Sequence, residues 1–174
     1  MAGRALLVID MLNDFASPGG ALYVGDTVGP VSERIRQELS SFRAGGGTVI
    51  YICDRHRPDD AEFKMFKPHC IAGTRGAEVI EVLKPQEGEI VIPKRRYSAF
   101  YGTELDLFLR EKGIKEIVLT GVCTNICVLY TAADARMRGY EVTVLAGAVT
   151  SFDAQAHAFA LAEMEHTLGA KLEP

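Results

Sequence analysis

Short runs rich in valine and isoleucine alternate with longer amphipathic stretches along the whole chain of 174 residues. Runs of this length and composition predict strands that are buried on both faces of a sheet, and the stretches between them predict helices. The alternation favours an α/β fold of three layers, in which helices cover both sides of a mostly parallel, Rossmann-like sheet of five to six strands. The strands are predicted at residues 5–9, 48–53, 89–93, 116–119 and 141–145.

Helices are predicted where apolar residues recur at helical spacing before a glycine. These stretches are residues 31–43, 103–111, 125–138 and 153–168. Residues 54–76 form the longest stretch without a predicted helix or strand, and a loop of this length is often functional. No internal repeat, low-complexity segment or linker marks a second domain, so residues 1–174 are expected to form one domain.

Charge and hydropathy exclude several classes of partner. The formal net charge is -4, which offers no basic field for nucleic acid or for an anionic membrane. No apolar run approaches the roughly 20 residues of a membrane span. The first ten residues lack the features of a signal peptide, so a cytoplasmic protein is expected, and its four cysteines are predicted to be free thiols.

Polar residues follow four of the predicted strands. They are Asp10, then Asp54 with His56, then Lys94, and finally the segment 121–127. In an open α/β sheet, ligands bind beyond the carboxyl ends of the strands. We therefore expect these four groups to converge at one edge of the sheet.

Cys127 is the candidate nucleophile at this edge. It follows the strand predicted at 116–119 and falls in the first turn of the next helix, which Thr124 or Asn125 is placed to cap. A helix N-terminus favours thiolate over thiol, and its free N–H groups stabilise a developing oxyanion. The alternatives are a small core cysteine at 127, or Cys123 as nucleophile, although Cys123 precedes the helix.

A cysteine nucleophile needs a group that accepts its proton and returns it to the leaving amine. No histidine follows a strand close to Cys127, and Asp10 at the end of the first strand is the candidate base. Lys94 adds a positive charge that stabilises thiolate and oxyanion. The alternative readings are a turn-capping role for Asp10 and a solvated surface position for Lys94.

Asp54, His56 and His69 form a candidate metal site. Asp54 and His56 are separated by one residue, so they point the same way on an extended segment. Two imidazoles and one carboxylate make an open site for zinc or a similar ion. Cys70 is a weaker alternative ligand, and Glu62 is placed to complete the shell through water. A surface Asp–His pair remains the alternative.

Five segments in this order carry a family resemblance. They are residues 8–15 (VIDMLNDF), 53–56 (CDRH), 68–77 (PHCIAGTRGA), 94–100 (KRRYSAF) and 121–128 (GVCTNICV). On these segments the chain resembles the nicotinamidase and isochorismatase-like cysteine hydrolases over nearly its full length. The resemblance implies the isochorismatase-like hydrolase fold, a small-molecule amide substrate and a homo-oligomer.

The resemblance also assigns roles to individual residues. It implies that Asp10, Lys94 and Cys127 form a catalytic triad, and that the backbone amides of Cys123 and Cys127 form the oxyanion hole. It further implies a cis peptide bond between Val122 and Cys123.

The residues at the candidate metal site bear on the substrate. In the family, members that act on nicotinamide hold a metal at the positions of Asp54, His56 and His69, and members that act on isochorismate or N-carbamoyl compounds generally lack this set. The resemblance therefore implies the deamidation of nicotinamide, or of an analogue such as pyrazinamide, with a divalent metal that is zinc, iron or manganese.

Two departures from the family pattern concern the substrate pocket. The chain has no tryptophan, although nicotinamidases usually carry one shortly before the histidine that matches His69. Phe66 stands in its place, with Phe15 as the opposite wall and Tyr97 as a third pocket residue. Asp59, Asp60 and Glu62 occupy the stretch in which many nicotinamidases have a further histidine.

Three other functions compete with a nicotinamidase. One is an isochorismatase-type or N-carbamoyl amide hydrolase with the same triad, and another is a catalytically silent member that binds a ligand. The third, a nucleotide-binding Rossmann protein, is disfavoured because no G-x-G-x-x-G follows the first strand.

Overall fold

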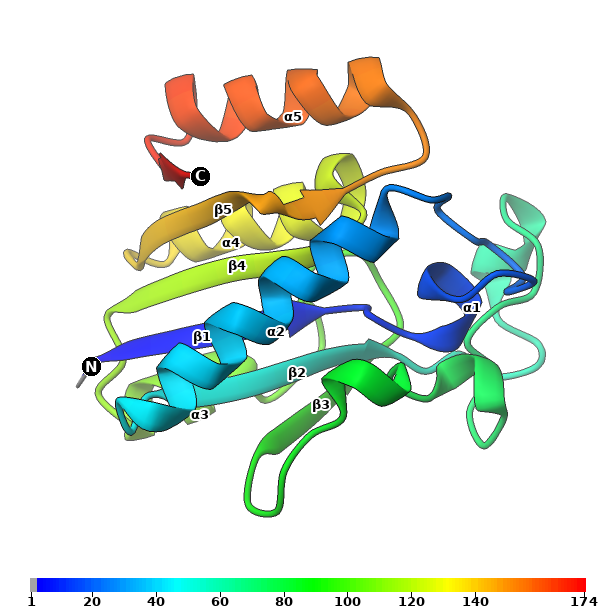
Figure 1. Ribbon diagram of the computed structural model, residues 1–174, viewed down its shortest axis with the longest axis horizontal. Helices are drawn as coiled ribbons and strands as arrows, with labels where there is room; N and C mark the ends of the chain where they lie inside the picture. Colours follow the sequence, from blue (N-terminus) through cyan, green and yellow to red (C-terminus); the bar gives the residue numbers. More distant parts are fainter. Residues whose placement is uncertain (1–2) are drawn as a thin grey trace.

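A single parallel sheet forms the centre of the protein (Figure 1). The computed structural model describes residues 3–174, so residues 1 and 2 of the expected domain lie outside it. The six strands are β1 (Arg4–Ile9), β2 (Thr48–Asp54), β3 (Ile90–Lys94), β4 (Glu116–Val122), β5 (Glu141–Thr150) and β6 (Lys171–Glu173). Their order is β3-β2-β1-β4-β5-β6, and every neighbouring pair is parallel. The predicted fold class is confirmed.

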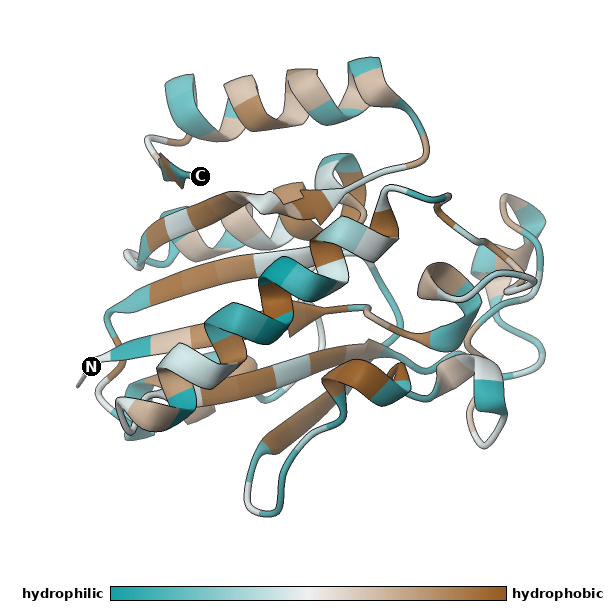
Figure 2. Cartoon of the chain, viewed as in Figure 1, coloured by the Kyte–Doolittle hydropathy of each residue, from teal (hydrophilic) through white to brown (hydrophobic). Residues whose placement is uncertain are grey.

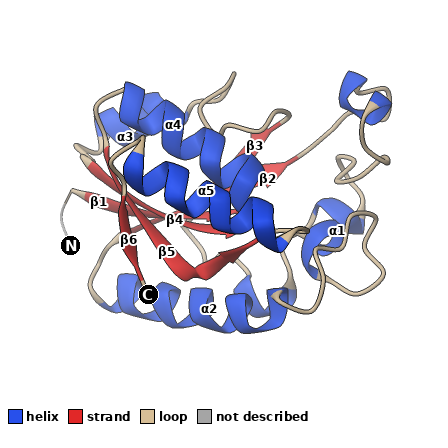
Figure 3. Ribbon diagram, turned by 90° about the horizontal axis from the view of Figure 1, so that it is seen from above, coloured by secondary structure: helices blue, strands red, loops and turns tan. Residues whose placement is uncertain are grey.

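Helices cover both faces of this sheet (Figure 3). The α-helices are α1 (Asn13–Ala16), α2 (Val28–Ala44), α3 (Leu105–Glu111), α4 (Leu129–Met137) and α5 (Ala154–His166). Shorter helical turns are η1 (Ala61–Lys64), η2 (Arg75–Ala77), η3 (Glu81–Leu83) and the π-type turn η4 (Thr124–Val128). Helix α2 lies on one face, and α3, α4 and α5 lie on the other (Figure 3). Among residues 3–174, no helix combines the length and the apolar character that crossing a membrane requires.

Two apolar cores separate the layers. Leu6 and Val8 of β1 face α2 and pack in one core with its Ile35, while Leu7 packs on the opposite side with Leu109 of α3. Because both faces of the central strands are buried, these strands read as continuous apolar runs rather than alternating ones. Figure 2 shows the result, with apolar strands at the centre and polar residues along α2.

The structure extends several predicted elements. Helix α2 begins at Val28 rather than at residue 31 because Pro30 is tolerated in the first turn, where an N–H has no helical partner. Strand β5 continues through a register irregularity to Thr150. Strand β6 was not predicted because it has only three residues, Lys171–Glu173, and no long apolar run.

Gly121 allows β4 to lie close to β1 near the carboxyl end of the sheet. Its φ is +106°, and a Cβ atom at this position would lie 1.9 Å from the carbonyl oxygen of Ile9. Any other residue would therefore collide with β1 just before Asp10. The close approach sets the turn that carries Cys127 beside the end of the first strand.

Candidate active site

The four groups predicted at the carboxyl edge of the sheet are brought together there. Asp10 follows β1, Asp54 and Lys94 end β2 and β3, and Cys127 lies in η4 directly after β4. The parallel register places Asp54 opposite Lys94, and the backbone N–H of Asp10 donates to Ile52 at 2.8 Å. Residues from four segments that are distant in the sequence therefore form one buried cluster.

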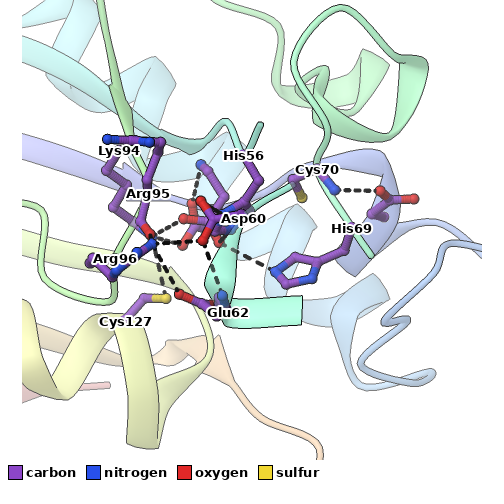
Figure 4. A network of polar contacts seen from close by, with 12 residues as sticks. His56, Asp60, Glu62, His69, Cys70, Lys94, Arg95, Arg96 and Cys127 are labelled. Carbon is purple, nitrogen blue, oxygen red and sulfur yellow. Dashed lines mark hydrogen bonds and ion pairs between the residues drawn. The ribbon is translucent and has the colours of Figure 1, made fainter. Parts of the chain in front are cut away.

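The ammonium group of Lys94 lies at the centre of this cluster (Figure 4). Its Nζ is 2.8 Å from Asp10 Oδ2, 2.5 Å from Asp54 Oδ1 and 3.5 Å from Cys127 Sγ. Burial lowers the pKa of Lys94, but the charges of Asp10 and Asp54 raise that pKa well above its ordinary value. Lys94 therefore stays protonated and compensates the buried carboxylates.

The carboxylate of Asp10 is fixed in place by its neighbours. Its backbone has a φ of 52°, a left-handed conformation that is uncommon for residues other than glycine. Its Oδ1 accepts a hydrogen bond from the backbone N–H of Asp54 at 2.8 Å. Burial and the charge of Asp54 raise the pKa of Asp10 to about 6, against the opposing effect of Lys94. Asp10 is therefore mostly ionised at neutral pH and accepts a proton readily.

Cys127 is held as a thiol rather than a thiolate. Its side chain is buried, and this burial, together with Asp10 and Asp54, raises the pKa of the thiol well above its ordinary value despite Lys94. Desolvation and two nearby carboxylates therefore oppose the thiolate that the helix N-terminus was expected to favour. The geometry instead calls for a base beside the sulfur.

The turn that carries Cys127 has no side-chain cap and is held by contacts with residues that follow β5. Thr124 Oγ1 lies 2.8 Å from His157 Nδ1, and the hydroxyl of Ser151 donates to Asn125 Oδ1. The expected cap by Thr124 or Asn125 is therefore absent. The two side chains bond instead to His157 of α5 and to Ser151, which follows β5. His157, which reads as an ordinary helix residue in the sequence, is tied to this turn.

Cys123 precedes the turn η4, and its carbonyl oxygen accepts the first hydrogen bonds of that turn. The peptide bond between Val122 and Cys123 is cis, as the resemblance implies. The carbonyl oxygen of Cys123 accepts from the N–H groups of Ile126 and Val128 at 3.0 and 3.2 Å. All four cysteines are free, as the sequence predicts, and all four are buried.

Asp54, His56 and His69 form a second cluster beside the first. Their ligand atoms lie within 4.8 Å of one another. The Nε2 atoms of His56 and His69 lie 3.5 and 3.8 Å from Asp54 Oδ2. The other carboxylate oxygen of Asp54 contacts Lys94, so Asp54 belongs to both clusters.

The donor set of this second cluster fits a divalent metal ion. His69 Nδ1 donates to the carbonyl of Lys67 at 2.7 Å, and His56 Nδ1 lies 3.1 Å from Asp60 Oδ2. With the proton of each ring on Nδ1, both Nε2 atoms are free to bind a metal. His56 Nε2 is buried and has no hydrogen-bond partner, as expected for a ligand atom.

The loop that carries His69 is anchored through Asp14. The Oδ2 atom of Asp14 accepts from the backbone N–H of Cys70 at 2.7 Å. A Cβ atom at residue 76 would lie 2.1 Å from this same oxygen, so Gly76 is required for the contact. The sulfur of Cys70 faces the carbonyl of Gly76 at 3.9 Å, and Cys70 is not among the clustered ligands, which does not support it as a metal ligand.

Both clusters open into one pocket. The three residues predicted from the resemblance, Phe15, Phe66 and Tyr97, line it, and Glu62 also lines it beside Asp54. Cys123, Cys127 and His69 of the predicted site line it as well. The other lining residues are apolar and were not predicted as pocket residues; they are Leu22, Val122, Ile126 and Phe152. Phe152 follows the observed end of β5 at Thr150, but the strand was predicted to end at residue 145, so the rule that placed the other groups did not reach it.

Comparison with known proteins agrees with this architecture. The model of the isochorismatase domain family matches residues 4–172. An isochorismatase family protein PncA of Bacillus subtilis is 38% identical, covering 97% of this chain and 98% of its own length. A ureidoacrylate amidohydrolase of Methylorubrum extorquens is 36% identical, covering 82% of this chain and 68% of its own length.

Solved structures show the same likeness. The nicotinamidase/pyrazinamidase PncA of Bacillus subtilis superposes with a TM-score of 0.94 at 38% identity, covering 98% of this chain and 99% of that one. The pyrazinamidase of Pyrococcus horikoshii in complex with zinc superposes with a TM-score of 0.92 at 32% identity, covering 98% of both chains.

Proposed function

The chain belongs to the isochorismatase family and is a hydrolase that acts on an amide C–N bond; from this premise we propose that it deamidates nicotinamide, or an analogue such as pyrazinamide. The products are the carboxylic acid and ammonia, and the reaction passes through a thioester on Cys127.

One observation carries the proposal: the carboxylate of Asp54 joins the thiol cluster to the two-histidine cluster. One oxygen of Asp54 contacts Lys94, which in turn contacts Cys127, and the other faces His56. A flat pyridine amide has a reactive carbonyl at one end and a ring nitrogen at the other. The pocket offers a nucleophile to the first and a metal-ligating set to the second.

The reaction begins with a proton transfer. Asp10, as carboxylate, takes the proton of the Cys127 thiol, and Lys94 stabilises the thiolate that forms. The sulfur attacks the amide carbon, and the backbone N–H groups of Cys123 and Cys127 hold the oxyanion. The C–N bond breaks as protonated Asp10 gives its proton to nitrogen, and ammonia leaves.

Water completes the reaction. With Asp10 again as base, a water molecule attacks the thioester carbon, the C–S bond breaks, and the acid leaves while Cys127 regains its proton. Phe15, Phe66 and Tyr97 line the space for the flat ring.

Asp54, His56 and His69 would hold a divalent ion, which we propose to be zinc, with iron or manganese as alternatives. Such an ion, when bound, supplies a Lewis-acid site for a ring nitrogen. Glu62 lies beside these residues in the same pocket and is a candidate to complete the shell. The zinc complex of the Pyrococcus horikoshii pyrazinamidase supports this assignment.

An N-carbamoyl amide hydrolase is the second candidate, favoured by the likeness to a ureidoacrylate amidohydrolase. Such acyclic substrates carry a carboxylate. Among the described residues, however, the pocket lining contains no lysine or arginine, and Asp54 and Glu62 are part of it. This lining favours a neutral aromatic amide over an anion.

Ammonia release tests the proposal. Purified protein, with its metal content measured on the same sample, is assayed with nicotinamide, pyrazinamide and ureidoacrylate at equal concentrations. We expect the highest kcat/KM with the two aromatic amides. A higher kcat/KM with ureidoacrylate, or no ammonia from any aromatic amide, would overturn the substrate assignment. Light scattering on the same sample tests the expected homo-oligomer.

A further inference from the structure

Asp60 is a buried carboxylate outside both the proposed triad and the proposed metal ligands. Its side chain is 1% exposed, and it stands at the start of η1, the turn that leads to Glu62. A buried carboxylate is costly unless its oxygens are paired. The groups that pair with the carboxylate of Asp60 therefore indicate which part of the site it stabilises.

Three donors surround the two oxygens of this carboxylate (Figure 4). Oδ2 lies 3.1 Å from His56 Nδ1. Oδ1 accepts from the backbone N–H of Glu62 at 3.1 Å and from Arg96 Nη1 at 3.0 Å. One side chain thus contacts a proposed metal ligand, the backbone of a second residue of the site, and a cation that neutralises it.

We propose that Asp60 is the positioning residue of the metal site: it holds the proton of His56 on Nδ1, directs Nε2 at Asp54, and fixes Glu62 at the same pocket. A histidine ligand whose second nitrogen donates to a carboxylate is locked in tautomer and ring orientation, and becomes a stronger ligand. The inference rests on the proposed function in one respect, namely that a divalent ion binds at Asp54, His56 and His69.

Asparagine at this position would break the arrangement without changing its shape. Both oxygens of Asp60 act as acceptors, one toward His56 and one toward Glu62 and Arg96. An amide group offers one acceptor oxygen and one NH₂ donor. In Asp60→Asn, the NH₂ group therefore faces either the N–H groups of Glu62 and Arg96, whose contacts are then lost, or His56 Nδ1, which can accept from it only if the imidazole proton moves to Nε2, the proposed ligand atom.

A matched control lies at the neighbouring position. Asp59 is exposed, and Asp59→Asn removes one carboxylate charge from the adjacent position in the same loop. A loss of metal affinity in Asp60→Asn alone therefore reports the contacts of the buried carboxylate. A loss shared by both variants reports only the general negative charge of the loop.

The experiment is a titration of metal-free protein with Zn²⁺ in the presence of a competing chelator. Wild type, Asp60→Asn and Asp59→Asn are compared at one pH, and the Tm of each metal-free protein is recorded. We expect Asp60→Asn to raise the Kd for Zn²⁺ by about 10- to 100-fold. The Kd of Asp59→Asn should equal that of the wild type.

Arg96→Gln is a second variant that keeps the test decisive if Asp60→Asn does not fold. The side chain of Arg96 is 44% exposed, so its loss leaves the core intact, yet it removes the cation that holds Asp60 Oδ1. We expect a higher Kd for Zn²⁺ than in the wild type, by a smaller factor than in Asp60→Asn.

The outcomes separate this inference from the proposed function. If Asp60→Asn binds Zn²⁺ as tightly as the wild type, the role of Asp60 is overturned and the metal site still stands. If Asp60→Asn does not fold, equal affinity of Arg96→Gln and the wild type gives the same conclusion. Equal weakening in Asp60→Asn and Asp59→Asn also overturns it. A wild type that binds no Zn²⁺ overturns the metal site, and the role of Asp60 with it.

Discussion

The ammonium of Lys94 lies 2.5 Å from Asp54 Oδ1, so the proposed catalytic lysine directly contacts a proposed metal ligand. The contact follows from the sheet itself, because the parallel register of β2 and β3 places these two residues opposite each other. Charge at the metal-ligating cluster and charge at the thiol cluster are therefore coupled through one carboxylate.

Removal of the Lys94 charge should destabilise the fold as well as the reaction. In Lys94→Met, Asp10 and Asp54 remain buried without their cation, which costs about 3–5 kcal/mol of unfolding free energy. Urea denaturation of the metal-free proteins measures the loss. Lys115 is exposed, and Lys115→Met should stay within about 0.5 kcal/mol of the wild type. Equal stability of the two variants would contradict the buried network.

The activity should depend on the ionisation of Asp10. Burial and Asp54 raise the pKa of this carboxyl to about 6, and the base form is the carboxylate. We therefore predict that kcat/KM for nicotinamide rises with pH through about 6 and then levels off. A profile of kcat/KM between pH 4.5 and 8 provides the check, and a flat profile below pH 6 would exclude Asp10 as the base.

The same raised pKa has the opposite effect on stability. Because the folded state holds this proton more tightly, the contribution of Asp10 to stability is complete below its ordinary pKa of 3.8 and is lost as pH rises through about 6. Comparison of Asp10→Asn with the wild type across this range isolates the effect from other titrations.

Removal of bound metal should weaken substrate binding. If the ion anchors the ring nitrogen, chelation raises KM for nicotinamide by at least about tenfold, and added Zn²⁺ restores it. The measurement needs metal analysis of the stripped protein. Unchanged KM and kcat after verified removal would count against any role of the metal in binding.

His157 should affect the rate more than the affinity. Its Nδ1 lies 2.8 Å from Thr124 Oγ1 and fixes the turn that carries Cys127. Loss of this contact in His157→Ala allows the sulfur to shift, and we expect kcat to fall by about 10- to 100-fold with little change in KM.

Two further variants control for His157. His157→Asn retains a polar group near Thr124 and should recover part of kcat. His166→Ala alters an exposed histidine of the same helix, whose side chain is 76% exposed, and should behave as wild type. A kcat for His157→Ala that equals the value for His166→Ala would show that the contact is unimportant.

Much of the fold and of the site can be predicted from the sequence, because both depend on the same signal. Apolar runs mark buried strands, and in a parallel sheet the residues that follow them meet at one edge. This reasoning alone gathers Asp10, Asp54, Lys94 and Cys127. It does not establish their roles, which stay predictions until activity is measured.

What the sequence does not reveal depends on partners that are distant along the chain. The contact between His157 and Thr124 joins a helix to a turn 33 residues away, and no periodicity signals it. Asp60 reads as one of several acidic loop residues until its burial is known. The raised pKa of Cys127 likewise arises from desolvation, which only packing reveals.

The most direct test of the proposed chemistry is ammonia release from nicotinamide by Cys127→Ala, with Cys53→Ala as a control for loss of a buried thiol elsewhere. Both variants are first shown to fold by circular dichroism and Tm. We expect Cys127→Ala to lose at least about 10³-fold in kcat, whereas Cys53→Ala remains active. Ammonia release by Cys127→Ala at a rate near that of the wild type would exclude Cys127 as the nucleophile.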